Sequence, residues 1–459
     1  MTIIGKNSLL SMLLGCAVIA ASPVAAKAPD LAPTPPMGWN SWDSYGFTID
    51  EADYRANAQV LASIKQHGWT YAVVDMGWYM GRPSGDKRET RDFEIDANGL
   101  LLPTPNRFPS AAGGAGFKPL ADWVHSLGLK FGFHIMRGIP RGAVERNTPI
   151  AGSAFHAADA ADTSDVCGWD DSNYGIRDNA AGQAYYDSMM RLYAQWGADF
   201  IKVDCIADHP YRPTEIRQIA AAIKKSGRQI VLSLSPGATQ LEHAAEVAQY
   251  SQMWRISNDI WDKWHFHDDP GEYPAGVDTA FDTLAKWSQY VKAGTWPDAD
   301  MLPLGSLRPH PGMGEPRDSG LTQDEQRTQF TLWAIARSPL MLGTNLTQLD
   351  PFTRSLVTND KVIGVNQTAR ESHALSELPP GFENVRVWVA SAGKAGKPVR
   401  YIAFFNVADQ PAQVSTTWSQ LGIAGERSAL NLWTGEKLAP ARTITLTLPK
   451  HGSAIYEVR

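Results

Sequence analysis

Short apolar segments alternate with longer amphipathic segments from residue 35 to about residue 346. The apolar segments are rich in residues that favour strands, and the amphipathic ones have the apolar spacing of surface helices. Strands that are buried on both faces show continuous apolar runs, which is typical of parallel sheets joined by helices. The alternation therefore predicts a parallel sheet covered by helices.

The alternating region contains eight strand candidates. They lie at residues 37–42, 70–78, 129–136, 198–204, 229–236, 253–259, 298–305 and 338–346. Eight such units over roughly 330 residues suit a (β/α)8 TIM barrel with long loops. A doubly wound open sheet is the alternative. Thr322 and Glu325 have the spacing of a capping box, which predicts a helix that starts there.

The pattern of apolar and polar residues changes after about residue 370. Segments such as VRVWVASAG and VRYIAFFNVAD alternate apolar and polar residues, with turn residues between them. This pattern predicts a C-terminal antiparallel β-sandwich of about 90 residues. We therefore expect a signal peptide at 1–26, a catalytic barrel at 27–368 and a C-terminal β-sandwich domain at 369–459.

The first 26 residues have the composition of a targeting segment. Lys6 supplies positive charge, an apolar run follows, and small residues end at Ala26. A lipid anchor at Cys16 is an alternative, but the apolar run continues past Cys16. No later segment reaches the roughly 20 apolar residues that span a bilayer. We expect an exported protein, periplasmic or secreted, without a membrane span.

Charge and cysteine content narrow the possible partners. The net charge of −6 is spread without long runs of one sign, which argues against nucleic acid or an anionic membrane as the main partner. Cys167 and Cys205 remain after the signal peptide. In an oxidising compartment they either pair or stay as two unrelated buried thiols. The oligomeric state is unknown from these features.

Functional side chains of a barrel lie at the carboxyl ends of its strands. The candidates at these positions are Asn40, Trp42, Asp75, Trp78, His134, Arg137, Lys202, Asp204, Ser235, Arg255, Asp259, Asp298 and Asp300. Carboxylates from four strands repel one another, so at least one should have a raised pKa unless cations offset the charge. Lys202 and Arg255 are the available cations.

Two facing carboxylates are what glycoside cleavage requires, one to attack the anomeric carbon and one to protonate the leaving oxygen. Lys202 and Asp204 are two residues apart, so they share a face of a strand, and Lys202 would keep Asp204 ionised. Asp259 follows the apolar part of its strand, where it could donate a proton. Taken singly, an aspartate at a strand end is more often a helix cap or a turn residue than a catalytic group.

The segment HFHDD at residues 265–269 has metal-binding residue types, but ligands spaced so tightly in a loop are usually incidental. His134 alone is better explained as a hydrogen-bonded wall residue than as a base. We therefore expect neither a metal nor a cofactor.

Five segments resemble glycoside hydrolase family 27, whose members include α-galactosidases and α-N-acetylgalactosaminidases. They are TPPMGWNSWDSYG, FIKVD, WRISND, WPDADMLPLG and RSPLMLGTNL, in the family's order from about residue 34 onward. The resemblance implies a retaining mechanism with Asp204 as the nucleophile and Asp259 as the acid/base. It also implies a barrel followed by an antiparallel domain.

The resemblance further implies which residues contact the sugar. Lys202 and Arg255 fall on sugar-binding positions, and Trp39 or Trp42 would form part of the pocket wall. The full substrate-binding set that we predict is Trp39, Trp42, Asp75, Trp78, His134, Cys167, Lys202, Ser235 and Arg255. The family's disulfide suggests a Cys167–Cys205 bond, although its second cysteine stands two residues after the nucleophile and Cys205 only one.

Two positions depart from the family's galactosidases, which bind O4 and O6 of galactose with an acid pair after the second strand. Asp75 matches the first acid, but Met76 replaces the second and cannot accept those hydrogen bonds. Ser235 replaces an acid of the fifth strand and would leave room for a 2-acetamido group.

The leading expectation is an exported α-galactosidase that acts on terminal sugar residues of a carbohydrate substrate. Other glycosidases of the same fold are alternatives that differ only in the sugar they release. They are an α-N-acetylgalactosaminidase, a β-L-arabinopyranosidase and an enzyme that acts on isomaltose-type glucose units. A carbohydrate-binding protein that has lost catalysis is the alternative from another class.

Overall fold

The computed structural model describes residues 31–82, 93–267, 272–309, 315–394 and 397–459. The expected signal peptide, with Cys16 and the cleavage site after Ala26, lies outside these residues. Of the helices that are described, none combines the length and the apolar character needed to cross a membrane.

Eight parallel strands form the larger sheet, in the spatial order β10-β9-β8-β7-β3-β2-β1-β13. The strands are β1 (Met37–Asn40), β2 (Tyr71–Val74), β3 (Lys130–Met136), β7 (Phe200–Asp204), β8 (Val231–Leu234), β9 (Met253–Arg255), β10 (Trp296–Asp298) and β13 (Leu340–Leu342). All seven pairings between neighbours in this order are parallel.

The two ends of this sheet meet just beyond β10. Leu302 forms a parallel bridge with Leu342, its N–H donates to the Met341 carbonyl at 2.8 Å, and its carbonyl accepts from Gly343 at 3.0 Å. These bonds close the curled sheet, so the predicted barrel is confirmed and the open doubly wound sheet is excluded.

The seventh strand differs from its prediction. Residues 298–305 were expected to form it, but β10 ends at Asp298. Asp300 has a φ of 85°, which an extended strand cannot accommodate. Leu302 and Leu304 are instead fully buried beyond the strand, which explains their apolar character.

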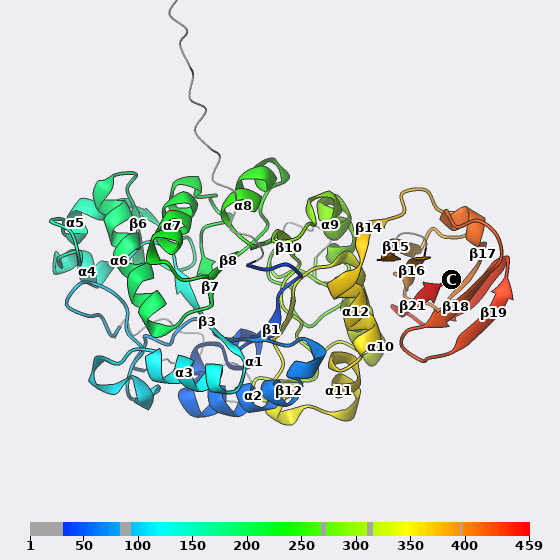
Figure 1. Cartoon of the computed structure of the whole chain (residues 1–459), viewed down its shortest axis with the longest axis horizontal. Coiled ribbons are helices and arrows are strands. Elements are labelled where there is room, and N and C mark those ends of the chain that lie inside the picture. The colour runs from blue at the N-terminus through cyan, green and yellow to red at the C-terminus, as the bar shows by residue number, and fades with distance from the viewer. Residues whose placement is uncertain (1–30, 83–92, 268–271, 310–314, 395–396) are drawn as a thin grey trace, which may run out of the picture.

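Helices surround the barrel strands (Figure 1). They include α2 (Glu51–Ser63), α3 (Lys118–Ser126), α6 (Ala180–Trp196), α7 (Pro213–Ser226), α8 (Ala244–Tyr250), α9 (Thr279–Trp287) and α10 (Gln323–Ala336). The predicted capping box of α10 is confirmed: the Thr322 hydroxyl accepts from the Glu325 N–H, and the Glu325 carboxylate accepts from the Thr322 N–H at 2.8 Å.

A long insertion after β3 folds into a small antiparallel sheet of its own. Its strands β4 (Ile139–Pro140), β6 (Asn173–Ile176) and β5 (Ala161–Val166) are ordered β4-β6-β5. The connection between β5 and β6 carries Cys167, which forms a disulfide with Cys205. The pairing that the sequence left open is therefore present, and it ties the insertion to the end of β7.

The C-terminal region consists of antiparallel sheets, as predicted. Six strands, β14 (Arg370–Ala374), β15 (Val385–Lys394), β16 (Lys397–Asn406), β21 (Ser453–Val458), β18 (Arg427–Asn431) and β19 (Lys437–Ala441), form one sheet. A second sheet pairs β17 (Ala412–Thr417) with β20 (Thr443–Leu448). Buried side chains from both sheets, among them Phe404, Val414, Ile444 and Tyr456, form a separate core.

Helix α10 joins the barrel to this C-terminal region. The Thr328 hydroxyl donates to the His451 carbonyl at 2.7 Å, and the Trp433 indole donates to the Thr331 hydroxyl at 2.9 Å. No described residue of the C-terminal sheets is among those that line the cavity described below.

Candidate active site

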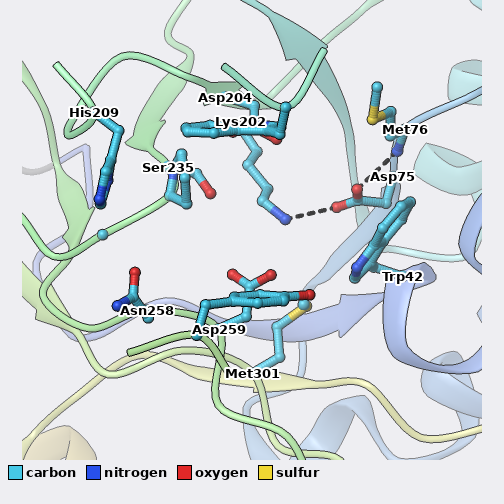
Figure 2. Close-up of a pocket in the computed structure, with 14 residues that line it drawn as sticks. Trp42, Asp75, Met76, Lys202, Asp204, His209, Ser235, Asn258, Asp259 and Met301 are labelled. Atoms are coloured by element: carbon cyan, nitrogen blue, oxygen red, sulfur yellow. Dashed lines mark hydrogen bonds and ion pairs between the residues drawn. The ribbon is translucent and has the colours of Figure 1, made fainter. Parts of the chain in front are cut away.

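A cavity of about 430 Å³ opens at the carboxyl ends of the barrel strands (Figure 2). This volume is in the range of small-molecule sites. The described residues that line it are Trp42, Asp75, Met76, Trp169, Lys202, Asp204, His209, Ser235, Pro236, Gly237, Asn258, Asp259, Tyr273 and Met301.

Asp204 occupies one wall, at the last residue of β7. The register of β3 and β7 places His134 opposite Lys202 and Met136 opposite Asp204. One Asp204 oxygen lies 3.1 Å from His134 Nε2, and the other accepts the Cys205 N–H at 2.6 Å. Strand pairing thus fixes the partners of this carboxylate.

The surroundings of Asp204 favour its ionised form. Burial raises the pKa of this carboxyl, but the hydrogen bond and charge from His134, the charge of Lys202 and the Cys205 N–H together outweigh burial. The pKa of Asp204 therefore lies below its ordinary value, and the group is a carboxylate at neutral pH.

Asp75 and Lys202 form a buried ion pair beside Asp204. Lys202 Nζ donates to Asp75 Oδ2 at 2.9 Å, and Asn40 Nδ2 donates to the same oxygen at 2.7 Å. Burial raises the pKa of Asp75, but the charges of Lys202 and His134 lower it to about 2. The pair gives this side of the cavity fixed donors and acceptors suited to sugar hydroxyls.

Asp259 lies on the other side of the cavity from Lys202 in the view of Figure 2. It follows β9 in a loop, and its side chain is 32% exposed, against 17% for Asp204. Arg255 Nη2 donates to Asp259 Oδ1 at 3.0 Å, while Arg255 Nη1 lies 2.8 Å from Asp300 Oδ1. One buried guanidinium is therefore shared by two carboxyl groups.

The structure brings most of the predicted site residues together. Trp42, Asp75, Lys202, Asp204, Ser235 and Asp259 line the cavity. His134 and Arg255 lie behind the lining and contact Asp204 and Asp259, respectively. Their observed contacts are therefore with the two carboxyl groups and not with the open cavity.

Trp39 and Trp78 are not among the lining residues, although both were predicted to contact substrate. Successive side chains of a strand point to opposite faces, and Asn40 already points to Asp75, so Trp39 points outward toward Tyr54 of α2. Its indole donates to the Thr344 carbonyl at 2.8 Å. Trp78 donates to the His134 carbonyl at 2.7 Å. Both side chains are fully buried in the core.

Cys167 is also absent from the lining, because its sulfur is bonded to Cys205. Its contribution is indirect. The disulfide holds the connection that carries Trp169 against the residue that follows Asp204, and Trp169 does line the cavity.

Several lining residues were not predicted: Trp169, His209, Asn258, Tyr273 and Met301. Asn258 and Met301 lie directly beside Asp259 and Asp300, so their positions in the motifs were a usable signal. Trp169, His209 and Tyr273 come from irregular connections, where neither helical nor strand periodicity marks the side of a residue that faces the cavity.

The predicted repulsion between carboxyl groups is relieved at two buried positions. Burial raises the pKa of Asp300 to about 7, with further contributions from the charges of Asp259 and Asp298 that Arg255 only partly offsets. Burial also raises the pKa of Asp43 well above its ordinary value, helped by the charge of Asp300. Asp43 was not predicted. It follows Trp42 on α1 (Trp42–Tyr45).

The HFHDD segment has no metal-like arrangement in its described part. His265 Nδ1 pairs with Asp278 Oδ2 at 2.7 Å, and His267 Nδ1 lies 3.1 Å from Glu272. Asp268 and Asp269 lie outside the described residues. Over the described ranges, no group of three or more His, Cys, Asp or Glu side chains could hold a metal ion.

Family models match both parts of the chain. The model described as "Alpha galactosidase A" matches residues 173–368, and the model described as "Alpha galactosidase C-terminal beta sandwich domain" matches residues 382–458. Among curated relatives, alpha-galactosidase A of Cellvibrio japonicus is 28% identical and covers 99% of this chain and 99% of its own.

Solved structures agree with these matches. A GH27 β-L-arabinopyranosidase from Geobacillus stearothermophilus is 42% identical, covers 93% of this chain and 97% of its own, and has a TM-score of 0.87. A variant of that enzyme in complex with arabinose has the same identity and coverage, with a TM-score of 0.86. Alpha-galactosidase I from Mortierella vinacea, at 24% identity with coverages of 94% and 98%, shares the fold with a TM-score of 0.69.

The two family models together match more than half of the chain, and an enzyme of the family is 42% identical over almost all of it. These matches agree with the barrel, the C-terminal antiparallel sheets and the acidic cavity. The chain belongs to glycoside hydrolase family 27 and is a glycoside hydrolase with a carbohydrate substrate.

Proposed function

We propose that the protein is an exo-acting, retaining glycosidase in which Asp204 is the nucleophile and Asp259 is the acid/base. The observation that carries the proposal is that both carboxyl groups line one cavity, Asp204 beside His134 and Lys202 and Asp259 paired with Arg255. Asp204 is held as a carboxylate, which is the form that attacks. Asp259 is the more exposed of the two, which suits a group that exchanges a proton with a leaving group and with water.

The reaction then has two steps. In the first, Asp204 attacks the anomeric carbon while Asp259 gives its proton to the glycosidic oxygen, so the leaving group departs and a glycosyl ester forms on Asp204. In the second, Asp259 takes a proton from water as the water attacks the same carbon, which frees Asp204 and restores the proton on Asp259. Two displacements leave the configuration of the anomeric carbon unchanged.

We propose a terminal β-L-arabinopyranosyl unit as the preferred sugar. A β-L-arabinopyranoside has the ring configuration of an α-D-galactopyranoside but lacks the hydroxymethyl group on C5. Met76 lines the cavity next to Asp75, and by family resemblance it replaces the second acid of the pair with which galactosidases bind O4 and O6. A galactosyl O6 that meets a thioether loses a hydrogen bond, which costs about 1–3 kcal/mol, or roughly 10- to 100-fold in rate.

α-Galactosidase activity is the second candidate, and it is favoured by the family models and by the curated relative from Cellvibrio japonicus. N-Acetylgalactosamine is a third sugar to test, because Ser235 is a small residue in the lining. Cleavage of all three kinds of glycoside would depend on the same pair of carboxyl groups, Asp204 and Asp259.

A panel of p-nitrophenyl glycosides tests the proposal: β-L-arabinopyranoside, α-D-galactopyranoside and N-acetyl-α-D-galactosaminide. We expect kcat/KM for the arabinopyranoside to exceed that for the galactoside by about 10-fold or more. A higher value for the galactoside or the acetylgalactosaminide would overturn the choice of sugar. Binding without release of nitrophenol from any substrate would support the non-catalytic alternative.

Export is part of the proposal. It is supported by the composition of residues 1–26 and by the Cys167–Cys205 disulfide, which is a bond typical of oxidising compartments. Fractionation of expressing cells checks it, and mature protein confined to the cytoplasm would contradict it.

A further inference from the structure

The structure assigns Asp300 a positioning role in the acid/base step. We infer that Asp300, which is not among the residues lining the cavity, holds both Arg255 and the Ile260 N–H and so fixes where the Asp259 carboxyl meets the leaving group. This inference rests on the proposed acid/base role of Asp259.

Both carboxylate oxygens of Asp300 are engaged, and its side chain is only 3% exposed. Oδ1 lies 2.8 Å from Arg255 Nη1, and Oδ2 accepts the Ile260 N–H at 2.8 Å. The backbone is fixed as well, since its carbonyl accepts from the Trp333 indole at 2.8 Å and its N–H donates to Asp298 Oδ1 at 3.0 Å. Asp300 is therefore a rigid anchor.

These contacts bracket Asp259 on both sides. Arg255, the cation of Asp259, is held by Asp300 on one side, and Ile260, the next residue in the chain, is held on the other. The φ of 85° at Asp300 costs energy for a non-glycine residue, and such strain is concentrated at functional positions. One side chain thus fixes both the main chain and the counterion of Asp259.

The shared guanidinium also fixes the place of the Asp259 side chain. Arg255 Nη2 donates to Asp259 Oδ1 at 3.0 Å, while Arg255 Nη1 lies 2.8 Å from Asp300 Oδ1. A planar guanidinium that is held on one edge by a rigid carboxyl group presents its other N–H groups in a fixed direction. Asp300 therefore sets the direction in which the Asp259 carboxyl faces the cavity.

The charged and titratable groups that face Asp300 come from several elements. They are Arg255 at the end of β9, Asp259 in the loop that follows, Asp298 on β10, Lys202 on β7 and Asp43 on α1. Burial raises the pKa of Asp300 to about 7, and Asp259 and Asp298 act in the same direction. Asp300 therefore gains or loses its own proton close to neutral pH.

The test compares kcat and KM of Asp300→Asn and the wild type, on a substrate with a poor leaving group and on a nitrophenyl glycoside. Asn keeps the shape and can accept the Ile260 N–H, but it removes the ion pair with Arg255. A displaced Asp259 delivers its proton less well, so we expect kcat to fall about 10-fold or more for the poor leaving group and much less for the nitrophenyl glycoside. KM should change little.

Asp43→Asn is the matched control. Asp43 is another buried carboxyl group of the cluster, but among the described residues no hydrogen bond or ion pair joins it to Arg255 or Ile260. The ratio of kcat between the two substrates should therefore stay near that of the wild type. A ratio that is unmoved in Asp300→Asn, or that moves equally in Asp43→Asn, would overturn the inference.

A second measurement covers the case in which Asp300→Asn does not fold. In protein with carbon-13-labelled aspartate, the Asp300 carboxyl should titrate near neutral pH, and its midpoint should fall in Asp259→Asn because a like charge has gone. An unchanged midpoint would show that Asp300 and Asp259 do not share Arg255, which would overturn the inference. A wild-type protein that cleaves no glycoside would instead refute the proposed function, which is a separate result.

Discussion

The two sides of the cavity hold their carboxyl groups in different ways. Asp204 is the last residue of a barrel strand, and the residues that ionise it, His134 and Lys202, are set by strand pairing and by alternation along the strand. Asp259 lies in a loop beyond β9, and its cation is shared with a second carboxyl group on a neighbouring connection.

This difference matches the two tasks that we propose. A nucleophile needs one fixed charge state, and a strand end with several donors provides it. An acid/base must carry a proton in one step and lose it in the other, which a shared cation and partial exposure allow. The Asp204 side should therefore tolerate no change of charge, while the Asp259 side should respond in a graded way.

Asp204→Asn removes the proposed nucleophile and should produce the largest effect. We expect kcat to fall on the order of 10⁴-fold, since Asn cannot form the glycosyl ester. Thermal unfolding should still be cooperative, because the amide can accept the Cys205 N–H. Substantial residual kcat in a preparation free of wild-type enzyme would break the assignment.

Asp259→Ala should slow different substrates to different extents, depending on how much their leaving group needs a proton. Substrates with poor leaving groups need the proton and should slow by about 10²- to 10⁴-fold, whereas nitrophenyl glycosides should slow much less in the first step. Rates for a series of aryl glycosides of increasing leaving-group pKa measure this directly. Equal losses across the series would show that Asp259 is not the acid.

Met76→Asp tests which sugar the cavity prefers. An acid at this position could accept a hydrogen bond from galactosyl O6, so the ratio of galactoside to arabinopyranoside kcat/KM should rise about 10-fold. Met76→Leu is the control, because it keeps the wall apolar and should leave the ratio near that of the wild type. A ratio that Met76→Asp leaves unchanged would remove Met76 from the account of specificity.

His134→Ala should move the acid limb of kcat/KM. The limb reports protonation of Asp204, whose pKa lies below its ordinary value, so wild-type activity should persist to a lower pH than an ordinary aspartate would allow. Without the hydrogen bond and charge of His134, the pKa of Asp204 rises and activity is lost at a higher pH. We expect an upward shift of about one unit, and a limb that did not move would show that His134 does not set the charge of Asp204.

The barrel and the strand-end residues were predictable because the local pattern determines them. Continuous apolar runs marked the strands, and the two-residue spacing of Lys202 and Asp204 placed both side chains on one face. The same alternation should have excluded Trp39, which is adjacent to Asn40. The motif WNSW shows which residue types are present but does not by itself show which of them faces inward.

The remaining features depend on contacts between distant segments. Trp169 and Tyr273 reach the cavity from irregular connections, and the position of Trp169 depends on a disulfide whose partner is 38 residues from Cys167. The role inferred for Asp300 depends on where Arg255 lies in the folded barrel. Neither arrangement has a local sequence pattern that could have predicted it.

Mass spectrometry of a trapped intermediate tests the central claim most directly. A fluorinated arabinopyranosyl substrate that forms the glycosyl ester but slows its hydrolysis should label the protein once, and peptide mapping should place the label on Asp204. Asp259→Ala should carry the same label. A label on Asp259, or an inverted first product with no covalent intermediate, would contradict the account.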